Sequence, residues 1–357
     1  MEREEYISKI VERQKQLSEI LGVSGHEEKV VEFIQNEVKD IMNELWVDVN
    51  GNLIGIMKGE SEDGVLLDAH TDEIGFMITH VDEKGFCRFT SLGGWDPRTL
   101  LGQSVIAEPI GKRIHGVIGA LPPHITKVEE RTKPVPIEQM FIDFGFISKK
   151  EANEEGIIVG SVATAYSGFQ ELVNGKLKGK AFDDRSGCNV LIQTAINIAN
   201  KKRSHTVCFT WSTQEEVGAR GARTSAFTVM EKFNIIMALA CENTTAAGVP
   251  GVAPYMSPSL MGKGAAITLM DNSMIASKKV RERLIKIAES EKIPYQIKTP
   301  SGGGTDAGVI HITKHGVPSG VVSVPGRYIH SPCTIIDRMD LVAACDLVTA
   351  FVLHPMD

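Results

Sequence analysis

Four apolar runs, each followed closely by an acid or a histidine, constrain the fold of this chain more than any other feature. Continuous apolar runs of this kind are typical of strands buried on both faces, as in a parallel sheet with helices on either side. Functional side chains in such sheets gather at the carboxyl ends of the strands. We therefore expect one shared site, built from His70 after 65–67, Glu215 after 206–211, Glu242 after 235–240 and His330 after 321–324.

Helical patterns between these runs complete the fold class. Residues 4–21 and 26–43 predict two helices, with Ser24 able to cap the second. An apolar stripe at helical spacing follows Asp184, and the last one covers about 338–353. Strands that alternate with helices predict an α/β fold, here a mixed and mostly parallel sheet flanked by helices.

The pattern changes after His70. Short alternating segments such as 76–81 appear, and a proline-rich stretch follows at 122–136. These features predict a smaller β-rich domain over 73–166. The larger α/β domain would then consist of 1–72 plus 167–357.

Composition narrows the range of functions. The chain has 357 residues, of which 23% are charged and 42% hydrophobic, as in ordinary globular proteins. A net charge of -7 without a block of Lys and Arg argues against a nucleic-acid partner. The start is charged, and no run approaches the roughly 20 apolar residues of a membrane span. We therefore expect no membrane association and a cytoplasmic location.

The six cysteines are spread along the chain without a Cys-x-x-Cys pair. Most lie in apolar runs, which indicates reduced thiols in the core. Cys241 directly precedes Glu242, so a thiolate metal ligand is the alternative there. Strand alternation, however, would point the two side chains in opposite directions.

Two pairs of polar residues suit a metal site, although each also has a plainer explanation. His70 and Asp72 would share one face of an extended segment, where the carboxylate can orient the imidazole. Asp183 and Asp184 precede a helical stripe, where acids commonly cap a helix and favour its dipole. Neither pair is decisive alone.

The adjacent acids Glu215 and Glu216 are harder to explain without a cation, because neighbouring carboxylates near a core repel each other. One of them could bind a metal while the other acts as a general base. A solvated helix start is the alternative, and His330 could be an ordinary loop histidine. Together these residues indicate a two-metal hydrolytic centre, since all the plainer explanations would have to hold at once.

Five motifs resemble those of the M42 family of metallo-aminopeptidases, in order and over essentially the whole chain. They are AHTDEIG at 69–75, GKAFDDR at 179–185, TQEEVG at 213–218, GGTDA at 303–307 and RYIHSP at 327–332. GGWDP at 93–97 and GVIG at 116–119 are similar to the inserted domain of that family.

The resemblance implies two divalent metal ions per subunit, with zinc or cobalt favoured and manganese possible. The implied ligands are Asp183 between the two ions, His70 and Glu242 at one ion, and Glu216 and His330 at the other. Glu215 would be the general base, and Asp72 would orient His70.

Members of the family hydrolyse N-terminal residues from peptides, and many assemble from dimers into tetrahedral dodecamers. The resemblance therefore implies peptide substrates, a homo-oligomer, and a dimerisation role for the inserted domain 73–166. The α/β domain of 1–72 plus 167–357 would be the catalytic metallopeptidase domain.

Two positions depart from the family pattern. Many relatives carry Asp at the position of Glu242, and relatives typically carry Asp at the position of Gly248. The glycines at 302–304 lack the Lys and Ser/Thr that follow in a phosphate-binding loop, so we expect them to approach a substrate backbone or to form a flexible turn. Asp306 would lie near the substrate pocket or cap the next helix.

Two other functions compete with the peptidase. An endoglucanase-type glycoside hydrolase needs only two carboxylates, and some relatives are described in that way. It leaves the histidines without a task, and an aromatic content of 6% offers no evident sugar platform. A non-catalytic shell protein of the same fold is the other alternative, which the intact ligand set and Glu215 disfavour.

Overall fold

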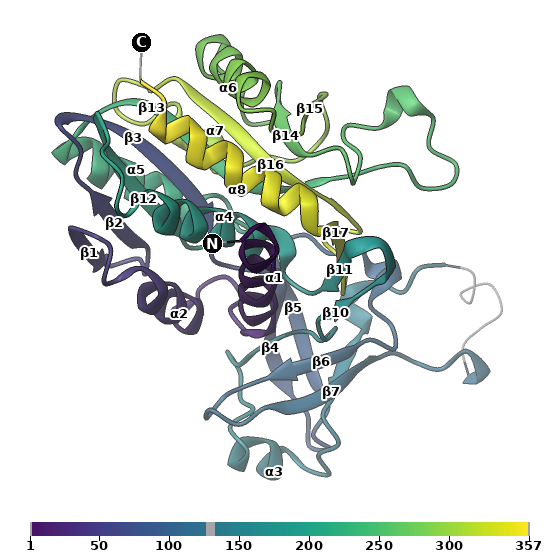
Figure 1. Cartoon of the computed structure of the whole chain (residues 1–357). Helices are drawn as coiled ribbons and strands as arrows, with labels where there is room; N and C mark the ends of the chain where they lie inside the picture. Colours follow the sequence, from purple (N-terminus) through teal and green to yellow (C-terminus); the bar gives the residue numbers. More distant parts are fainter. Residues whose placement is uncertain (1, 126–132, 356–357) are drawn as a thin grey trace.

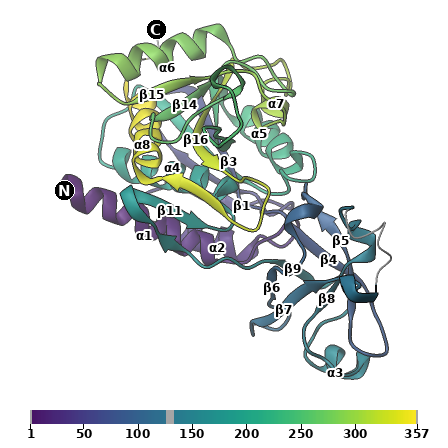
Figure 2. The same cartoon turned by 90° about the vertical axis from the view of Figure 1, so that its right-hand side faces the viewer.

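The structure is a computed structural model that describes residues 2–125 and 133–355. Figures 1 and 2 show a large sheet covered by helices and a smaller, mostly β body that projects from one end of it. Part of the proline-rich stretch predicted at 122–136 lies outside the described residues. None of the helices in these ranges combines the length and the apolar character that a membrane-spanning helix requires.

The centre of the large sheet is parallel. Strands β12, β3, β13 and β16 lie side by side in that order, and β1 and β2 extend the sheet beyond β12. On the other side follow β17, β11 and β10, while β14 and β15 pair beside β16. The bounds are β1 Glu44–Val47, β2 Leu53–Met57, β3 Ser61–His70, β10 Gln170–Glu171, β11 Lys176–Gly179, β12 His205–Ser212, β13 Asn234–Thr245, β14 Ala265–Thr268, β15 Tyr295–Lys298, β16 Ser319–Arg327 and β17 Thr334–Asp337.

Helices cover both faces of this sheet, which explains why its strands are continuously apolar. In β3, Val65 and Leu67 enter one core with α1, α2, α4, α6 and α8, while Leu66 enters a second core with α5 and α7. The bounds are α1 Arg3–Glu19, α2 Glu28–Val38, α4 Phe182–Ile198, α5 Arg220–Lys232, α6 Lys278–Ser290, α7 Ala307–Ile310 and α8 Arg338–Leu353. The predicted fold class is confirmed.

The smaller body is a closed antiparallel barrel in the order β4, β5, β8, β7, β6, β9. It has its own core, in which Phe76, Phe89 and Ile142 are buried. Its elements are β4 Gly75–Val81, β5 Cys87–Leu92, β6 Ser104–Ala107, β7 Ile114–Gly119, β8 Phe141–Asp143, α3 Lys149–Glu154 and β9 Val162–Ala165. These strands fall inside the range 73–166, whose boundaries as a domain remain a prediction.

Short 3-10 helices occur in the connections of both bodies. They are η1 Pro97–Thr99, η2 Pro123–Ile125, η4 Ile137–Gln139, η5 Val173–Gly175 and η6 Pro254–Met256.

The N-terminal helices differ from their predicted bounds. The helix expected over 26–43 is the shorter α2, and the capping role expected of Ser24 is wrong. The Ser24 hydroxyl instead donates a hydrogen bond of 2.6 Å to the buried Asp72 carboxylate. A buried carboxylate needs protein donors, whereas water can reach the first turn of a surface helix.

Candidate metal centre

The four central strands bring the predicted site residues to one edge of the sheet. His70 is the last residue of β3, and His330 follows β16. Glu215 and Glu216 lie in the loop between β12 and α5. Because β12, β3, β13 and β16 are parallel, their carboxyl ends meet at the same edge.

Glu242 lies inside its strand rather than just past the end. β13 continues to Thr245 because it pairs with β16 over this whole stretch, with Glu242 opposite Ser323. The neighbouring Cys241 packs in the apolar core and is not part of any candidate metal group among the described residues. All six cysteines are free and lie within the described residues.

The two acids at the start of α4 have separate environments. The Asp184 carboxylate accepts a hydrogen bond of 3.0 Å from the N–H of Gly187, three residues later, as a capping side chain does. Asp183 has non-helical backbone angles, and its carboxylate faces the cavity where the histidines lie. The peptide bond between the two acids is cis.

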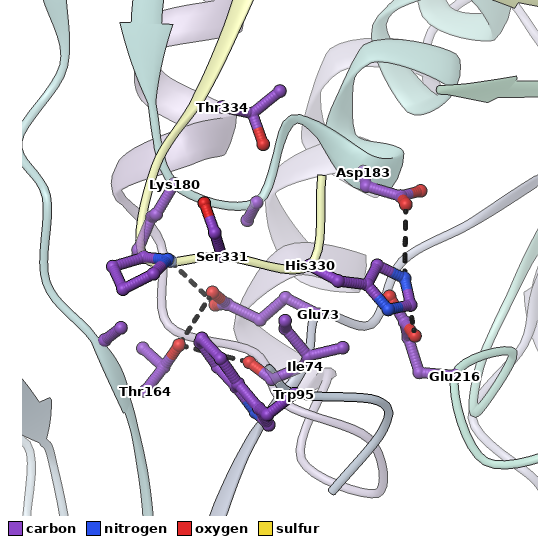
Figure 3. A pocket seen from close by; sticks show the side chains of 13 residues that line it. Glu73, Ile74, Trp95, Thr164, Lys180, Asp183, Glu216, His330, Ser331 and Thr334 are labelled. Carbon is purple, nitrogen blue, oxygen red and sulfur yellow. Dashed lines mark hydrogen bonds and ion pairs between the residues drawn. The ribbon is translucent and has the colours of Figure 1, made fainter. Parts of the chain in front are cut away.

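Asp183 lies between the two histidines, with one carboxylate oxygen toward each. Its Oδ1 is 3.4 Å from His70 Nε2, and its Oδ2 is 3.6 Å from His330 Nε2. Glu242 Oε2 is 3.8 Å from His70 Nε2, and Glu216 Oε2 is 3.4 Å from His330 Nε2. Figure 3 shows the contacts of His330 with Asp183 and Glu216.

These separations suit a shared cation better than direct hydrogen bonds. Direct N–H···O bonds span about 2.7–3.2 Å. Two ligands held about 2.0–2.2 Å from a tetrahedral ion lie about 3.3–3.6 Å apart. Three overlapping groups have ligand atoms within 4.8 Å of one another: His70, Asp184 and Glu242; His70, Glu215 and Glu216; and Asp183, Glu216 and His330. The imidazole and carboxylate donors are those that divalent zinc, cobalt and manganese accept.

Electrostatics supports the same interpretation. Burial raises the pKa of Glu215 to about 8, with Glu216 and Asp183 adding to the effect and His70 opposing it. Burial and the charge of Asp184 likewise raise the pKa of Glu242 well above its usual range. These acids are buried without enough positive charge from the chain, so they fit a site that binds cations.

Asp72 holds the loop that carries the paired glutamates. Its Oδ1 accepts a hydrogen bond of 2.9 Å from the N–H of Glu215, and its Oδ2 accepts one of 3.1 Å from the N–H of Glu216. Its Oδ1 also lies 3.4 Å from Nδ1 of His70, whose hydrogen-bond partner is the main-chain oxygen of Asp72 at 3.2 Å. Asp72 therefore contacts both the histidine strand and the glutamate loop.

Two further acids lie buried beneath the site. The Ser212 hydroxyl is 2.7 Å from Asp306 Oδ2 and 3.2 Å from Asp68 Oδ1, and burial raises the pKa of both acids. The capping role expected of Asp306 is wrong: its side chain makes no capping hydrogen bond, and its N–H donates to Glu242 Oε1 at 3.0 Å. Asp68 is absent from the predicted site, although an acid inside an apolar run two residues before His70 is a visible signal.

A second buried charged cluster lies beside the first (Figure 3). Glu73 Oε1 accepts a hydrogen bond of 2.7 Å from Lys180 Nζ, and Thr164 donates to Glu73 Oε2 at 3.0 Å. Arg185 Nη2 lies 3.6 Å from Glu73 Oε1. Burial lowers the pKa of Lys180 to about 8, although Glu73 opposes the shift. The negative charge of Glu73 is therefore compensated by the positive charges of Lys180 and Arg185.

The barrel also contacts the site. A Cβ added to Gly94, in the loop after β5, would lie 3.2 Å from Nδ1 of His330. Trp95 lines the narrow pocket that contains Glu73, Asp183 and His330 (Figure 3). Gly248, by contrast, has a φ of 80°, and its main-chain oxygen accepts a hydrogen bond of 3.4 Å from Arg327.

The profile of one protein family, described as M42 glutamyl aminopeptidase, matches residues 51–347. The chain belongs to the M42 family. The resemblance predicted from the motifs is therefore confirmed, and the protein is an aminopeptidase and thus a hydrolase. Membership implies metal dependence, in agreement with the candidate metal groups.

Relatives in the M42 family share most of their length with this chain. A putative aminopeptidase of Acetivibrio thermocellus is 36% identical over 94% of this chain and 96% of its own length. The lysyl aminopeptidase of Pyrococcus furiosus is 32% identical, over 97% and 98%. The glutamyl aminopeptidase of Lactococcus lactis is 30% identical, over 96% of each.

Solved structures agree with this assignment. An aminopeptidase of Desulfurococcus kamchatkensis has a TM-score of 0.92 and 38% identity, covering 98% of this chain and 95% of its own. The TET1 peptidase of Pyrococcus horikoshii, which can assemble into a tetrahedron or a large octahedral shell, has a TM-score of 0.85 and 32% identity, covering 97% and 100%. A Thermotoga maritima protein described as an endoglucanase has a TM-score of 0.77 and 33% identity, covering 95% and 96%.

Proposed function

We propose that this M42 protein is a two-metal aminopeptidase that removes N-terminal residues from peptides. The observation that carries the proposal is the position of Asp183, whose two carboxylate oxygens face two different histidines. A carboxylate in this position can belong to two metal ions at once. Zinc or cobalt suits the donors best, and manganese is compatible with them.

The ligands divide into two sets around Asp183. His70 and Glu242 would complete one ion, and Glu216 and His330 would complete the other. Two bound divalent ions supply a Lewis acid for the peptide carbonyl and lower the pKa of a water molecule. The chain supplies the geometry, because these ligands lie in strands, at a helix start or in the connections directly attached to them.

Glu215 is the proposed general base. Its carboxylate lines the same cavity as Asp183, and its Oε2 lies 3.9 Å from His70 Nε2. It would accept a proton from the attacking water and return it to the amine that leaves. Asp72 is a positioning residue, because its carboxylate holds the N–H groups of Glu215 and Glu216.

Restoring zinc, cobalt or manganese to metal-stripped protein, with a panel of amino-acid anilides as substrates, tests this function. We expect Glu215→Gln to keep the metal content of the parent protein and to lose most turnover. His70→Ala and His330→Ala should instead lose metal. Full peptidase activity in Glu215→Gln would contradict the assignment of the base.

The same assay decides between the peptidase and the alternatives. A glycosidase that uses only carboxylates would keep its activity after chelation, whereas the proposed peptidase loses it. A non-catalytic shell protein would release no aniline with any metal.

We also infer that the protein assembles through its barrel into dimers and then a dodecamer. TET relatives form such shells, one of them a dodecamer in its crystal. The barrel body exposes large apolar side chains at Ile110, Ile147 and Val159, which suits a contact surface. Sedimentation of the purified protein tests the assembly, and a monomer at micromolar concentration would contradict it. The cytoplasmic location stays a prediction.

A further inference from the structure

A cavity of about 470 Å³ opens beside the candidate metal centre. His70, Asp183 and Glu242 line one part of it. Lys298, at the end of β15, and residues 301–305 line another. The cavity is therefore wide enough for the side chain of a bound residue in addition to its backbone.

Lys298 is a buried cation that makes no direct ion pair among the described residues. The residue is only 4% exposed, and its ammonium makes no hydrogen bond or ion pair with any described residue. Burial lowers its pKa, while Asp271 and Glu242, which line the cavity, oppose that shift. Lys298 lines the same cavity as these two acids, so a ligand in the cavity can reach it.

Asp271 attracts Lys298 but makes no ion pair with it, and its oxygens hold a neighbouring turn instead. Its Oδ1 accepts hydrogen bonds from the N–H and the hydroxyl of Ser273, both at 2.7 Å. Its Oδ2 accepts the hydroxyl of Thr305 at 3.0 Å. These contacts fix the turn beside the glycine-rich segment and leave Lys298 available to a ligand.

We propose that Lys298 selects substrates whose first residue carries a carboxylate, so that N-terminal Glu or Asp is preferred over neutral or basic residues. This inference rests on the proposed function. A buried charge without a partner is costly, and a substrate carboxylate removes that cost. A site with an unpaired polar group also rejects an analogue that cannot pair with it. M42 relatives include both lysyl and glutamyl aminopeptidases, so family membership alone does not decide the preference.

A carboxylate can reach Lys298 from two sources. One is the side chain of the first residue, which is the source that we propose. The other is the C-terminus of a short peptide. Comparison of Leu-Ala with its C-terminal amide separates the two, because amidation removes only the second carboxylate.

The decisive experiment compares glutamyl and glutaminyl anilides, which differ in charge and hardly in shape, on the zinc-loaded protein. We expect the parent protein to favour the glutamyl substrate at least ten-fold in kcat/KM. Lys298→Met should abolish this preference, mainly through KM, and Lys298→Glu should shift the preference toward lysyl anilide. Lys278→Met, at an exposed lysine of α6, is the matched control and should retain the preference.

Each outcome separates this inference from the proposed function. Hydrolysis of no anilide by the parent protein would defeat the proposed function itself. Hydrolysis with equal rates for the two substrates, or an unchanged ratio in Lys298→Met, would overturn the role of Lys298 alone. Loss of metal in Lys298→Met with an unchanged ratio would show that Lys298 serves the metal ligands instead. A ten-fold loss on amidation of Leu-Ala would identify the C-terminal carboxylate as its partner.

Discussion

Two buried charged clusters lie side by side in this molecule, and their charges are compensated in different ways. Glu73 lies against Lys180 and Arg185, both buried, so the chain supplies the opposite charges itself. Next to it, the acids around Asp183 have two histidines and no lysine or arginine within ion-pair distance among the described residues. The first cluster is complete as it stands, whereas the second needs cations from outside.

The difference separates structural from functional acids. Asp72 and Glu73 are neighbours in sequence. Asp72 accepts hydrogen bonds from the loop that carries Glu215, whereas Glu73, just before the first barrel strand, forms an ion pair with Lys180. Burial of an acid alone therefore does not identify a functional site. Several buried acids that share one cavity without a matching cation of the chain are the stronger indication.

The largest effect should come from Asp183, the acid that we propose to be shared by both metal ions. Asp183→Asn removes a negative ligand from each, and even an outer partner of a metal ligand changes affinity or activity by about 10- to 100-fold. We expect the variant to lose both ions and more than about 100-fold in activity. Metal analysis and anilide hydrolysis measure this, with the exposed Glu231→Gln as control. A variant that retains both ions would remove the distinction between the clusters.

The next largest effect should appear in the balanced cluster, as a loss of stability rather than of metal. Glu73→Ala leaves Lys180 buried without its partner, and breaking a buried ion pair typically costs about 3–5 kcal/mol. Urea unfolding measures the loss, and the metal content of the folded fraction should match that of the parent protein. Adding Lys180→Met to Glu73→Ala should recover part of the stability. An equal loss of stability in the double variant would mean that the unpaired charge of Lys180 is not the cause of the loss.

A smaller effect is expected at Glu27, a buried acid close to Asp72. Burial raises the pKa of Glu27 to about 7. The folded state therefore holds a proton between about pH 4.5 and 7 that the unfolded state has lost, so stability falls as the pH rises through this window. Glu27→Gln should flatten that fall and be more stable at pH 8 by about 1–3 kcal/mol. Thermal unfolding at pH 5 and pH 8 tests this, and parallel curves for the two proteins would exclude it.

The smallest effect should come from shortening one ligand. Glu242 spans the distance between the N–H of Asp306 and Nε2 of His70. Glu242→Asp cannot reach both, so we expect about a ten-fold weaker affinity at one ion, or about 1.4 kcal/mol, and no change at the other. Calorimetric titration with zinc resolves the two steps. Equal weakening of both steps would contradict the division of ligands into two sets.

The sequence predicts the position of the site because its signal is local. Apolar runs define the parallel strands, and His70, Glu215 and His330 follow those runs within three to six residues. Glu242 also follows a run, but pairing with β16 extends β13 past it. Where a strand ends depends on how far its neighbour pairs with it, and the apolar run of one strand does not show this.

Contacts between distant segments are the part that the sequence does not predict. Glu73 and Lys180 meet across 107 positions, and Asp68 and Ser212 across 144. No spacing rule connects such residues. Lys298 ends a short strand and has no local feature that marks it as unpaired, so its place in the cavity appears only in three dimensions.

The pairing of β3 has a consequence for synthesis of the chain. Its partners in the described sheet, β12 and β13, both come later in the sequence, and about 135 residues separate His70 from His205. At about 5–20 residues per second, the ribosome needs roughly 7–27 s to produce that stretch. The barrel strands, from Gly75 to Ala165, emerge in this interval and pair only among themselves. During synthesis the barrel strands therefore have all their partners before β3 has any, so the apolar edges of β3 stay open for longer.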